Sequence, residues 1–380
     1  MYRSFQTMAL LSLLLPLAQA CAADASTKPG TDSGAAPDSA TVADARPEPD
    51  AAALDGHADT TGTLTKKWFP GHYLYVTSFS SFDGMKTAWR DVVKNNGHFA
   101  GYKAMYFWAT LEPSDGKYDF SMIIRDLNIA QADGKKLWIM ILNRQFSASA
   151  PYPLPDYIRT EPVYQGGIYH NAKNHQLPKL WIPEHGARFA ALFTAMGAAI
   201  DSHPALAGVQ VQETSLGESQ LQPGFSSAGL LQSTLTLHNA IGAAFPRTLF
   251  MQYVNWFGGL SSAQFDTIMA NLVHKVRGGF GGPDVYDFNN KTPLQMQAGA
   301  YWTLYDGKAA KGVSNQGDGY KRNSPQITFE TAVDTLNTNF VFWLPVQKSW
   351  SGDFKWYVED AIDVIDAEAG RVNTAQPNNL

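Results

Sequence analysis

The sequence predicts an α/β protein whose main domain is a (β/α)8 TIM barrel. Strand-like segments alternate with helix-like segments from about residue 68 onward, which indicates parallel strands. The segment Gly208–Gly217 alternates Val with Gln and runs into Glu213. A carboxylate that ends a buried strand is typical of the C-terminal mouth of such a barrel. The chain has 380 residues, 44% of them apolar, which suffices for one large domain.

Residues 1–20 have the pattern of a signal peptide. Arg3 precedes an apolar run, which is too short to span a membrane, and small residues follow it. Cys21, the only cysteine, comes next and cannot form an intramolecular disulfide. This N-terminus resembles that of bacterial lipoproteins. The resemblance implies a lipid on Cys21 and an outer-membrane anchor, with the protein in the periplasm or at the cell surface. The alternative is ordinary cleavage and a secreted, soluble protein.

Residues 21–65 are rich in Ala, Asp, Pro and Thr, and acidic residues outnumber basic ones there. Almost nothing in this segment can join a core, so we expect a disordered tether. We expect the barrel domain to occupy residues 66–380.

The net charge of −5 and the lack of a recurring basic patch argue against a nucleic-acid partner. We expect the protein to be a monomer.

Eight strands and the helices between them can be assigned in chain order. The predicted strands are His72–Phe79, Tyr102–Trp108, Lys136–Leu142, Gly208–Glu213, Leu249–Trp256, a segment ending at Asp284 or Asp287, a segment within Trp302–Gln316, and Phe340–Leu344. The predicted helices are Asp83–Asn95, Met122–Ala132, Gly186–Ser202, Leu230–Ala244, Phe265–Val276, Thr328–Asn337 and Phe354–Ala369. The glycine-rich sequence before residue 320 leaves the seventh strand without a defined register.

The most specific segment is WATLEPSDGKYDF, residues 108–120, which follows the second predicted strand. Gly116 supplies a turn, and Ser121 can cap the next helix. We expect Glu112 to shape this loop rather than to act in chemistry. A strand ending in Trp, then Leu-Glu-Pro, Gly and Tyr-Asp-Phe before an amphipathic helix resembles clan A glycoside hydrolases. These relatives of β-galactosidases, cellulases and xylanases are (β/α)8 barrels that hydrolyse O-glycosidic bonds.

The resemblance implies a catalytic role for Glu213. In the clan the general acid/base glutamate ends the fourth strand, usually after Asn, and here Gln212 stands before Glu213. For this role, burial and a second carboxylate must raise the pKa of Glu213 more than Arg144 lowers it. Polar and aromatic residues at the strand ends suit a sugar ring. The expected substrate-binding residues are Trp108, Asn143, Arg144, Gln212, Tyr253, Asn255, Trp256, Asn289, Gln316 and Trp343.

Glycoside hydrolysis normally needs a second carboxylate. In the clan this nucleophile is a glutamate that ends the seventh strand, but the sequence offers Asn315, Gln316 and Asp318 there. We expect Asp287 to be the second carboxylate, with Asp318 as the next candidate. Glu330 is near, but its helical pattern predicts that it faces solvent.

The long segment Ser147–Glu184 is typical of a loop that covers a binding site. It contains His170 and His175, but no carboxylate or second pair stands at ligand spacing, so we expect no metal. No glycine-rich phosphate loop follows a strand and no Gly-x-Ser-x-Gly motif occurs. We therefore expect neither nucleotide chemistry nor esterase chemistry, and no cofactor.

Two classes of function remain open. The first is an exported, lipid-anchored glycoside hydrolase that acts on an oligo- or polysaccharide with Glu213 as general acid/base. The second is a non-catalytic carbohydrate-binding lipoprotein on a degenerate barrel. A second carboxylate close to Glu213 across the mouth would favour the hydrolase.

Overall fold

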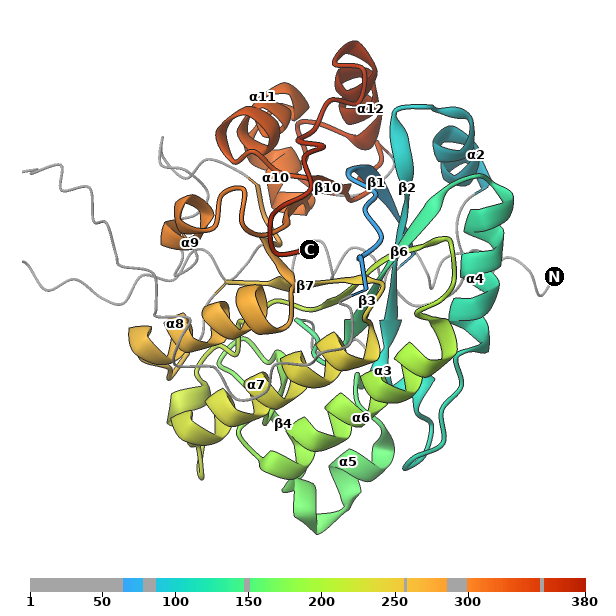
Figure 1. Ribbon diagram of the computed structural model, residues 1–380. Helices are drawn as coiled ribbons and strands as arrows, with labels where there is room; N and C mark the ends of the chain where they lie inside the picture. Colours follow the sequence, from blue (N-terminus) through green and yellow to red (C-terminus); the bar gives the residue numbers. More distant parts are fainter. Residues whose placement is uncertain (1–63, 78–86, 147–150, 256–257, 286–298, 349–351) are drawn as a thin grey trace, which may run out of the picture.

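The computed structural model describes residues 64–77, 87–146, 151–255, 258–285, 299–348 and 352–380. Eight parallel strands close into a barrel in the order β1-β10-β9-β8-β7-β6-β3-β2, and helices surround it (Figure 1). This arrangement confirms the predicted (β/α)8 barrel. The predicted signal peptide and the predicted tether, with Cys21, lie outside the described residues except for residues 64 and 65.

The barrel strands are short and buried. Their bounds are β1 Gly71–Thr77, β2 Phe99–Phe107, β3 Lys136–Leu142, β6 Leu206–Val211, β7 Leu249–Tyr253, β8 Gly279–Gly282, β9 Lys311–Asn315 and β10 Phe340–Trp343. A separate two-stranded sheet pairs β4 Ile168–His170 with β5 Gln176–Pro178 in antiparallel fashion.

The helices occupy the connections between the strands. The longer ones are α2 Thr87–Asn95, α4 Ser121–Ala132, α6 Pro183–Ile200, α7 Ser227–Ala244, α8 Ser262–Ala270 and α12 Val358–Ala367. The shorter ones are α3 Trp108–Leu111, α5 Asp156–Thr160, α9 Gly299–Leu304, α10 Gly317–Arg322 and α11 Pro325–Glu330. α8 and α11 each continue into one π-helical turn, η6 Asn271–Lys275 and η7 Thr331–Thr335. The described residues also contain the 3-10 turns η4 Pro162–Tyr164 and η5 Ser219–Leu221.

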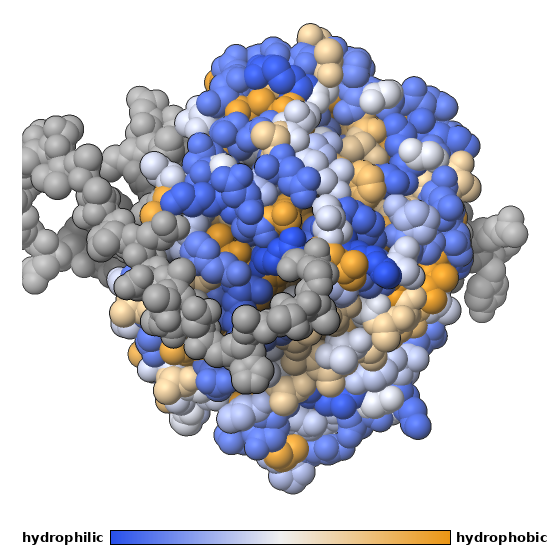
Figure 2. Space-filling model, in the orientation of Figure 1, coloured by the Kyte–Doolittle hydropathy of each residue, from blue (hydrophilic) through white to orange (hydrophobic). Residues whose placement is uncertain are grey.

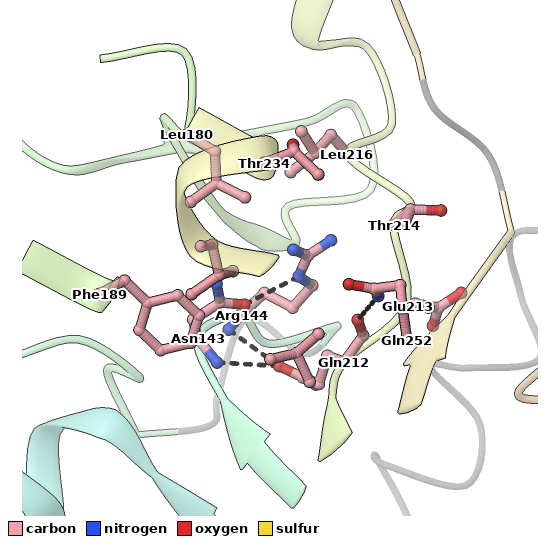
Figure 3. A pocket seen from close by; sticks show the side chains of 12 residues that line it. Asn143, Arg144, Leu180, Phe189, Gln212, Glu213, Thr214, Leu216, Thr234 and Gln252 are labelled. Atoms are coloured by element: carbon pink, nitrogen blue, oxygen red, sulfur yellow. Dashed lines mark hydrogen bonds between the residues drawn. The ribbon is translucent and has the colours of Figure 1, made fainter. Parts of the chain in front are cut away.

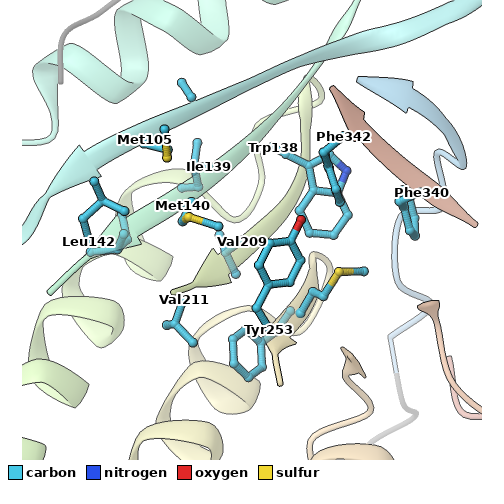
Figure 4. Close-up of a cluster of buried hydrophobic side chains, with 14 of the residues drawn as sticks. Met105, Trp138, Ile139, Met140, Leu142, Val209, Val211, Tyr253, Phe340 and Phe342 are labelled. Carbon is cyan, nitrogen blue, oxygen red and sulfur yellow. The ribbon is translucent and has the colours of Figure 1, made fainter. Parts of the chain in front are cut away.

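Large aromatic side chains pack together with aliphatic ones in the buried cluster of Figure 4. The Trp138 ring lies 5.0 Å from the Phe340 ring and 5.4 Å from the Phe342 ring, centroid to centroid. Gly208 faces this stack, because a Cβ there would lie 2.3 Å from the Trp138 ring. Since successive side chains of a strand point to opposite faces, the odd or even position of a residue decides whether it points into the barrel or toward the helices.

Segments from both ends of the domain close the N-terminal side of the barrel. Lys66 Nζ donates to the carbonyls of Phe245 and Thr248 at 2.9 and 3.1 Å. Asn339 Nδ2 donates to the carbonyl of Asn373 at 2.9 Å, and Arg277 Nε to that of Asn379 at 3.0 Å. A ligand therefore has to approach from the opposite, C-terminal side.

The expected long loop before α6 is more ordered than its sequence indicates. Within residues 151–182 it forms α5, η4 and the β4–β5 hairpin. Gln145 and Gln176 form an antiparallel bridge, which ties the hairpin to the end of β3. The Tyr169 hydroxyl donates to the carbonyl of Leu216, in the loop that follows β6. The hairpin thus supports the segment that carries Glu213. No helix in the described ranges is long and apolar enough to cross a membrane.

Candidate active site

Glu213 lies just beyond the C-terminal end of β6 and is only 5% exposed. Asn255, just beyond the end of β7, donates from its side-chain Nδ2 to Glu213 Oε2. The backbone also joins these two strand ends. Thr214 N donates to the carbonyl of Tyr253 at 3.1 Å, and Asn255 N donates to Thr214 Oγ1 at 2.9 Å. The carboxylate of Glu213 is therefore held in a fixed position between two strands.

Gln212 is half-buried and links the end of β6 to the end of β3. Its Oε1 accepts hydrogen bonds from the backbone N–H groups of Asn143 and Arg144 at 3.0 and 3.1 Å (Figure 3). Its carbonyl accepts from Gln252 Nε2 at 2.8 Å. The end of β3 is thus fixed against the end of β6.

Arg144 places a buried cation in this cluster. Its Nε donates to Asn143 Oδ1 at 3.1 Å and its Nη1 to the carbonyl of Ser215 at 2.5 Å. Burial lowers the pKa of Arg144 to about 10, and the negative charge of Glu213 opposes this shift. The guanidinium therefore keeps its positive charge at neutral pH and interacts with the carboxylate of Glu213.

The residues of this cluster line a small cavity (Figure 3). Its volume is about 30 Å³, and Asn143, Arg144, Gln212 and Glu213 line it together with apolar residues of α6 and α7. This space can hold one or two water molecules. Pockets that bind small-molecule ligands typically measure about 300–1,000 Å³, so this cavity is too small to be such a pocket.

Asp284 brings a second carboxylate to the mouth from β8. It is 9% exposed, and its Oδ1 is buried without a hydrogen-bond partner in the described part of the chain. Burial raises the pKa of Asp284 well above its usual value, and the negative charges of Glu213 and Asp318 raise it further, while Arg322 lowers it. Glu213 and Asp284 therefore lie within electrostatic reach of each other at the ends of β6 and β8.

Asp318 is the third acid of the mouth and lies in the first turn of α10, directly after β9. Burial raises its pKa, and Arg322 and Lys321 oppose that shift. The closest approach of Asp318 is 3.8 Å to Arg322 Nη2 and 3.9 Å to Lys321 Nζ. Because two cations face it, Asp318 is better compensated than Asp284.

The structure brings together four of the predicted binding residues around Glu213, namely Asn143, Arg144, Gln212 and Asn255. Gln316 is 9% exposed and directly precedes α10. The predictions for Asp287, Trp256 and Asn289 fall outside the described residues. For the second carboxylate, the described part of the chain offers Asp284, the other candidate end of the sixth strand.

Two tryptophans that were expected to contact the substrate, Trp343 and Trp108, do not reach the barrel mouth. Trp343 is fully buried and donates from Nε1 to His72 Nδ1 at 3.0 Å, between the barrel and its helices. Trp108 is also fully buried and packs on Phe189 of α6, with ring centroids 4.7 Å apart. Both residues occupy positions that point away from the barrel axis, so neither ring can stack on a sugar at the mouth.

Tyr253 points the other way, into the barrel, below the mouth. Its hydroxyl accepts from Lys103 Nζ at 3.0 Å and lies 2.5 Å from Ser314 Oγ. The Lys103 ammonium is fully buried and lies 4.1 Å from the centroid of the Phe342 ring. Tyr253 is 1% exposed and belongs to this internal polar cluster, so it is not a substrate contact as predicted.

Glu112 and Glu330 lie where the sequence predicts. Glu112 is fully buried and accepts hydrogen bonds from Trp108 Nε1 and Arg188 Nε, both at 2.7 Å, so it shapes its loop. Glu330 is exposed at the end of α11. Among the described residues, no group of three or more His, Cys, Asp and Glu side chains is arranged to hold a metal ion.

Sequence reasoning missed Trp356, the most exposed tryptophan among those described, with 37% of its surface accessible. It lies in the loop after β10, and its backbone N–H donates to the carbonyl of Tyr320 in α10 at 3.2 Å. In the same loop, Asp353 pairs with Lys321 of α10 at 2.7 Å. An exposed aromatic ring is thus attached to the helix that carries Asp318. The signal in the sequence was a tryptophan shortly after the last predicted strand.

Comparison with known proteins gives a result at the level of fold. No family model matches the chain, and no curated protein matches it. Among solved structures, endo-glycoceramidase II from Rhodococcus sp., as its lactosyl-enzyme intermediate, matches with a TM-score of 0.52 and 13% identity over 78% of each chain. A mutant Xylanase10C from Cellvibrio japonicus in complex with xylopentaose matches with a TM-score of 0.50 and 12% identity, over 83% of this chain and 69% of that one.

These structural neighbours are glycoside hydrolases, and this chain has the barrel fold that they share. At this level of identity the likeness concerns the fold. The function of this chain depends on the residues at the mouth of its own barrel, where Glu213 and Asp284 lie.

Proposed function

We propose that this protein is a glycoside hydrolase that cleaves an oligo- or polysaccharide at the barrel mouth, with Glu213 and Asp284 as its carboxylate pair. The observation that carries the proposal is the position of these two acids, which follow different strands at the same end of the barrel and are both almost buried. Most glycoside hydrolases use two carboxylates. One protonates the leaving oxygen, and the other attacks the anomeric carbon or activates a water molecule.

The surroundings of the pair support this chemistry. A reaction of this kind requires one carboxylic acid and one carboxylate at the same pH, and unequal environments create that difference. Glu213 has an amide donor and a nearby guanidinium, whereas Asp284 has a buried oxygen without a partner among the described residues. The structural neighbours include a lactosyl-enzyme intermediate and a xylopentaose complex, so we propose an oligosaccharide as the ligand class here as well.

We further propose that the barrel is exported and attached to the outer membrane through a lipid on Cys21. This part of the proposal rests on the N-terminal sequence, in which an apolar run and small residues precede the single cysteine. The following 44 residues, 22–65, would act as a spacer between the anchor and the barrel.

A second candidate function is carbohydrate binding without cleavage. One observation favours it: Asn315 and Gln316 occupy the end of β9, where the hydrolases that the sequence resembles have their nucleophile. In that case Glu213 and Asp284 would only bond sugar hydroxyl groups.

Hydrolysis of a panel of aryl glycosides and polysaccharides by the purified protein tests the proposal. We expect turnover of at least one substrate, and a loss on the order of a hundredfold or more with either Glu213→Gln or Asp284→Asn on an oligosaccharide. Glu330→Gln, an exposed change on α11, is the matched control and should keep full activity. Oligosaccharide binding without turnover by the wild type would establish the second candidate instead.

A further inference from the structure

We infer that Tyr253 is a positioning residue of the barrel mouth, which fixes the end of β9 relative to the end of β7 through a hydrogen bond that crosses β8. This inference rests on the proposed function, because it concerns the strands that carry the residues of the mouth. Tyr253 is the last residue of β7, and Ser314 lies in β9. Between these strands lies β8, which ends shortly before Asp284.

Gly281 gives the ring of Tyr253 room to cross β8. In the register of the sheet, Tyr253 pairs with Gly281, and Gly281 pairs with Gly312 of β9. A Cβ on Gly281 would lie 3.1 Å from Cε1 of the tyrosine ring and 2.0 Å from the carbonyl oxygen of Gly312. Because a side chain has no room there, the phenol passes over the bare backbone of β8 and reaches the next strand.

The hydroxyl of Tyr253 belongs to a hydrogen-bonded network that joins four strands. It lies 2.5 Å from Ser314 Oγ, which in turn lies 2.8 Å from the hydroxyl of Tyr75 in β1. Lys103 of β2 donates to the hydroxyl of Tyr253 at 3.0 Å. Burial raises the pKa of Tyr253 above its usual value, so the hydroxyl keeps its proton and can both donate and accept. All four side chains are buried, where a hydrogen bond is stronger than in water.

The backbone of Tyr253 connects this network to the mouth above it. Its carbonyl accepts from the backbone N–H of Thr214 at 3.1 Å, directly after Glu213. Asn255, two residues beyond Tyr253, donates to the carboxylate of Glu213. The hydroxyl of Tyr253 does not take part in these contacts. Its removal would therefore loosen the spacing of the strand ends without removing a contact of Glu213.

Spacing of this kind matters for the reaction more than for binding. Two carboxylates have to face the same bond from fixed positions, and a displacement of about 1 Å can slow a reaction by about a hundredfold. A change that acts only in the transition state lowers kcat, whereas a loss of uniform binding raises KM. A positioning role for Tyr253 therefore predicts a loss in kcat at an almost constant KM.

The kinetic constants of Tyr253→Phe on a cleaved oligosaccharide test this inference. We expect kcat to fall by at least about tenfold and KM to change by less than about twofold. Ser314→Ala should give the same pattern. The double variant should lose no more than either single variant, because both changes remove the same hydrogen bond. Thermal unfolding gives the stability of each variant.

Tyr73→Phe is the matched control. Tyr73 is fully buried in the same barrel, but its hydroxyl donates to the carbonyl of Phe69 at 2.6 Å, on the N-terminal side. This variant also loses one buried hydrogen bond, so its melting temperature should fall by a similar amount while kcat stays at the wild-type value.

A wild-type kcat for Tyr253→Phe would overturn the inference while leaving the hydrolase function standing. Equal losses of kcat for Tyr253→Phe and Tyr73→Phe would also overturn it, because any loosening of the core would then have the same effect. Additive losses in the double variant would contradict a shared bond between Tyr253 and Ser314. A wild-type protein that cleaves no substrate would remove the proposed function and this inference together.

Discussion

Two buried acids of this barrel differ in how their charge is compensated. Glu112 is fully buried and accepts hydrogen bonds from Trp108, Gly116 and Arg188, so each of its oxygens has a donor. Asp284 has a buried oxygen with no donor among the described residues and lies among like charges. A fully compensated acid stabilises the fold, whereas a poorly compensated one costs stability and is typical of functional sites.

We expect Glu112→Ala to destabilise the protein by about 3 kcal/mol, because it leaves the guanidinium of Arg188 without its buried partner. Denaturant unfolding measures the change, and Glu330→Ala on the exposed end of α11 is the control, with an expected effect within about 0.5 kcal/mol. If Glu112→Ala instead abolished activity at unchanged stability, Glu112 would belong to the chemistry rather than to the fold.

We expect Asp284→Asn to stabilise the protein at neutral pH. The pKa of Asp284 is raised in the folded state, so its contribution to stability is full below its ordinary pKa of about 4 and is lost as the pH rises through the folded value. The gain in melting temperature from Asp284→Asn should therefore be small near about pH 4 and grow toward about pH 8. Thermal unfolding across this range measures it. A gain that did not change with pH would contradict the raised pKa.

At the scale of elements, the sequence predicts the order of strands and helices and the position of Glu213. It does not predict the direction of side chains within a strand. Trp343 follows Phe342 and points to the opposite side of β10 from Phe340 and Phe342. All three side chains are buried, so hydrophobicity alone does not show which of them point into the barrel. The prediction that Trp343 contacts a substrate at the barrel mouth is wrong for this reason. The seventh strand lies within Trp302–Gln316 as predicted, as the five-residue β9, and Trp302 itself lies in α9.

We expect Trp356 to contribute to oligosaccharide binding. Its exposed ring lies in the loop attached to α10, and an aromatic face can cover the C–H face of a sugar. Trp356→Ala should weaken binding of a long oligosaccharide by about tenfold, which corresponds to about 1.4 kcal/mol. The melting temperature should change little. Calorimetric titration in the Glu213→Gln background avoids turnover. Unchanged affinity at every chain length would exclude this role.

At the scale of the whole molecule, the fold could be predicted because alternating strands and helices permit few closed arrangements. The candidate site could be predicted only in part. Glu213 ends a clear strand, but the neighbours of its carboxylate come from β3, β7 and β8, far away in the sequence. Their distances and burial depend on the closed barrel, so the choice of Asp284 needed the structure.

Attachment of the barrel to a membrane is a prediction for the full chain. If Cys21 carries a lipid, the wild-type protein should sediment with membranes, and Cys21→Ala should move it to the soluble fraction. Cell fractionation followed by immunoblotting measures this distribution, and detergent extraction controls for aggregation. An unchanged membrane fraction for Cys21→Ala would contradict the anchor.

Cleavage of an oligosaccharide followed by proton NMR tests the central claim most directly, because it detects both bond breaking and the anomer that forms first. We expect the wild type to release a single anomer initially, and Glu213→Gln to release product on the order of a hundredfold more slowly or worse. A wild type that binds the oligosaccharide without cleaving it, or a Glu213→Gln variant as fast as the wild type, would contradict the account.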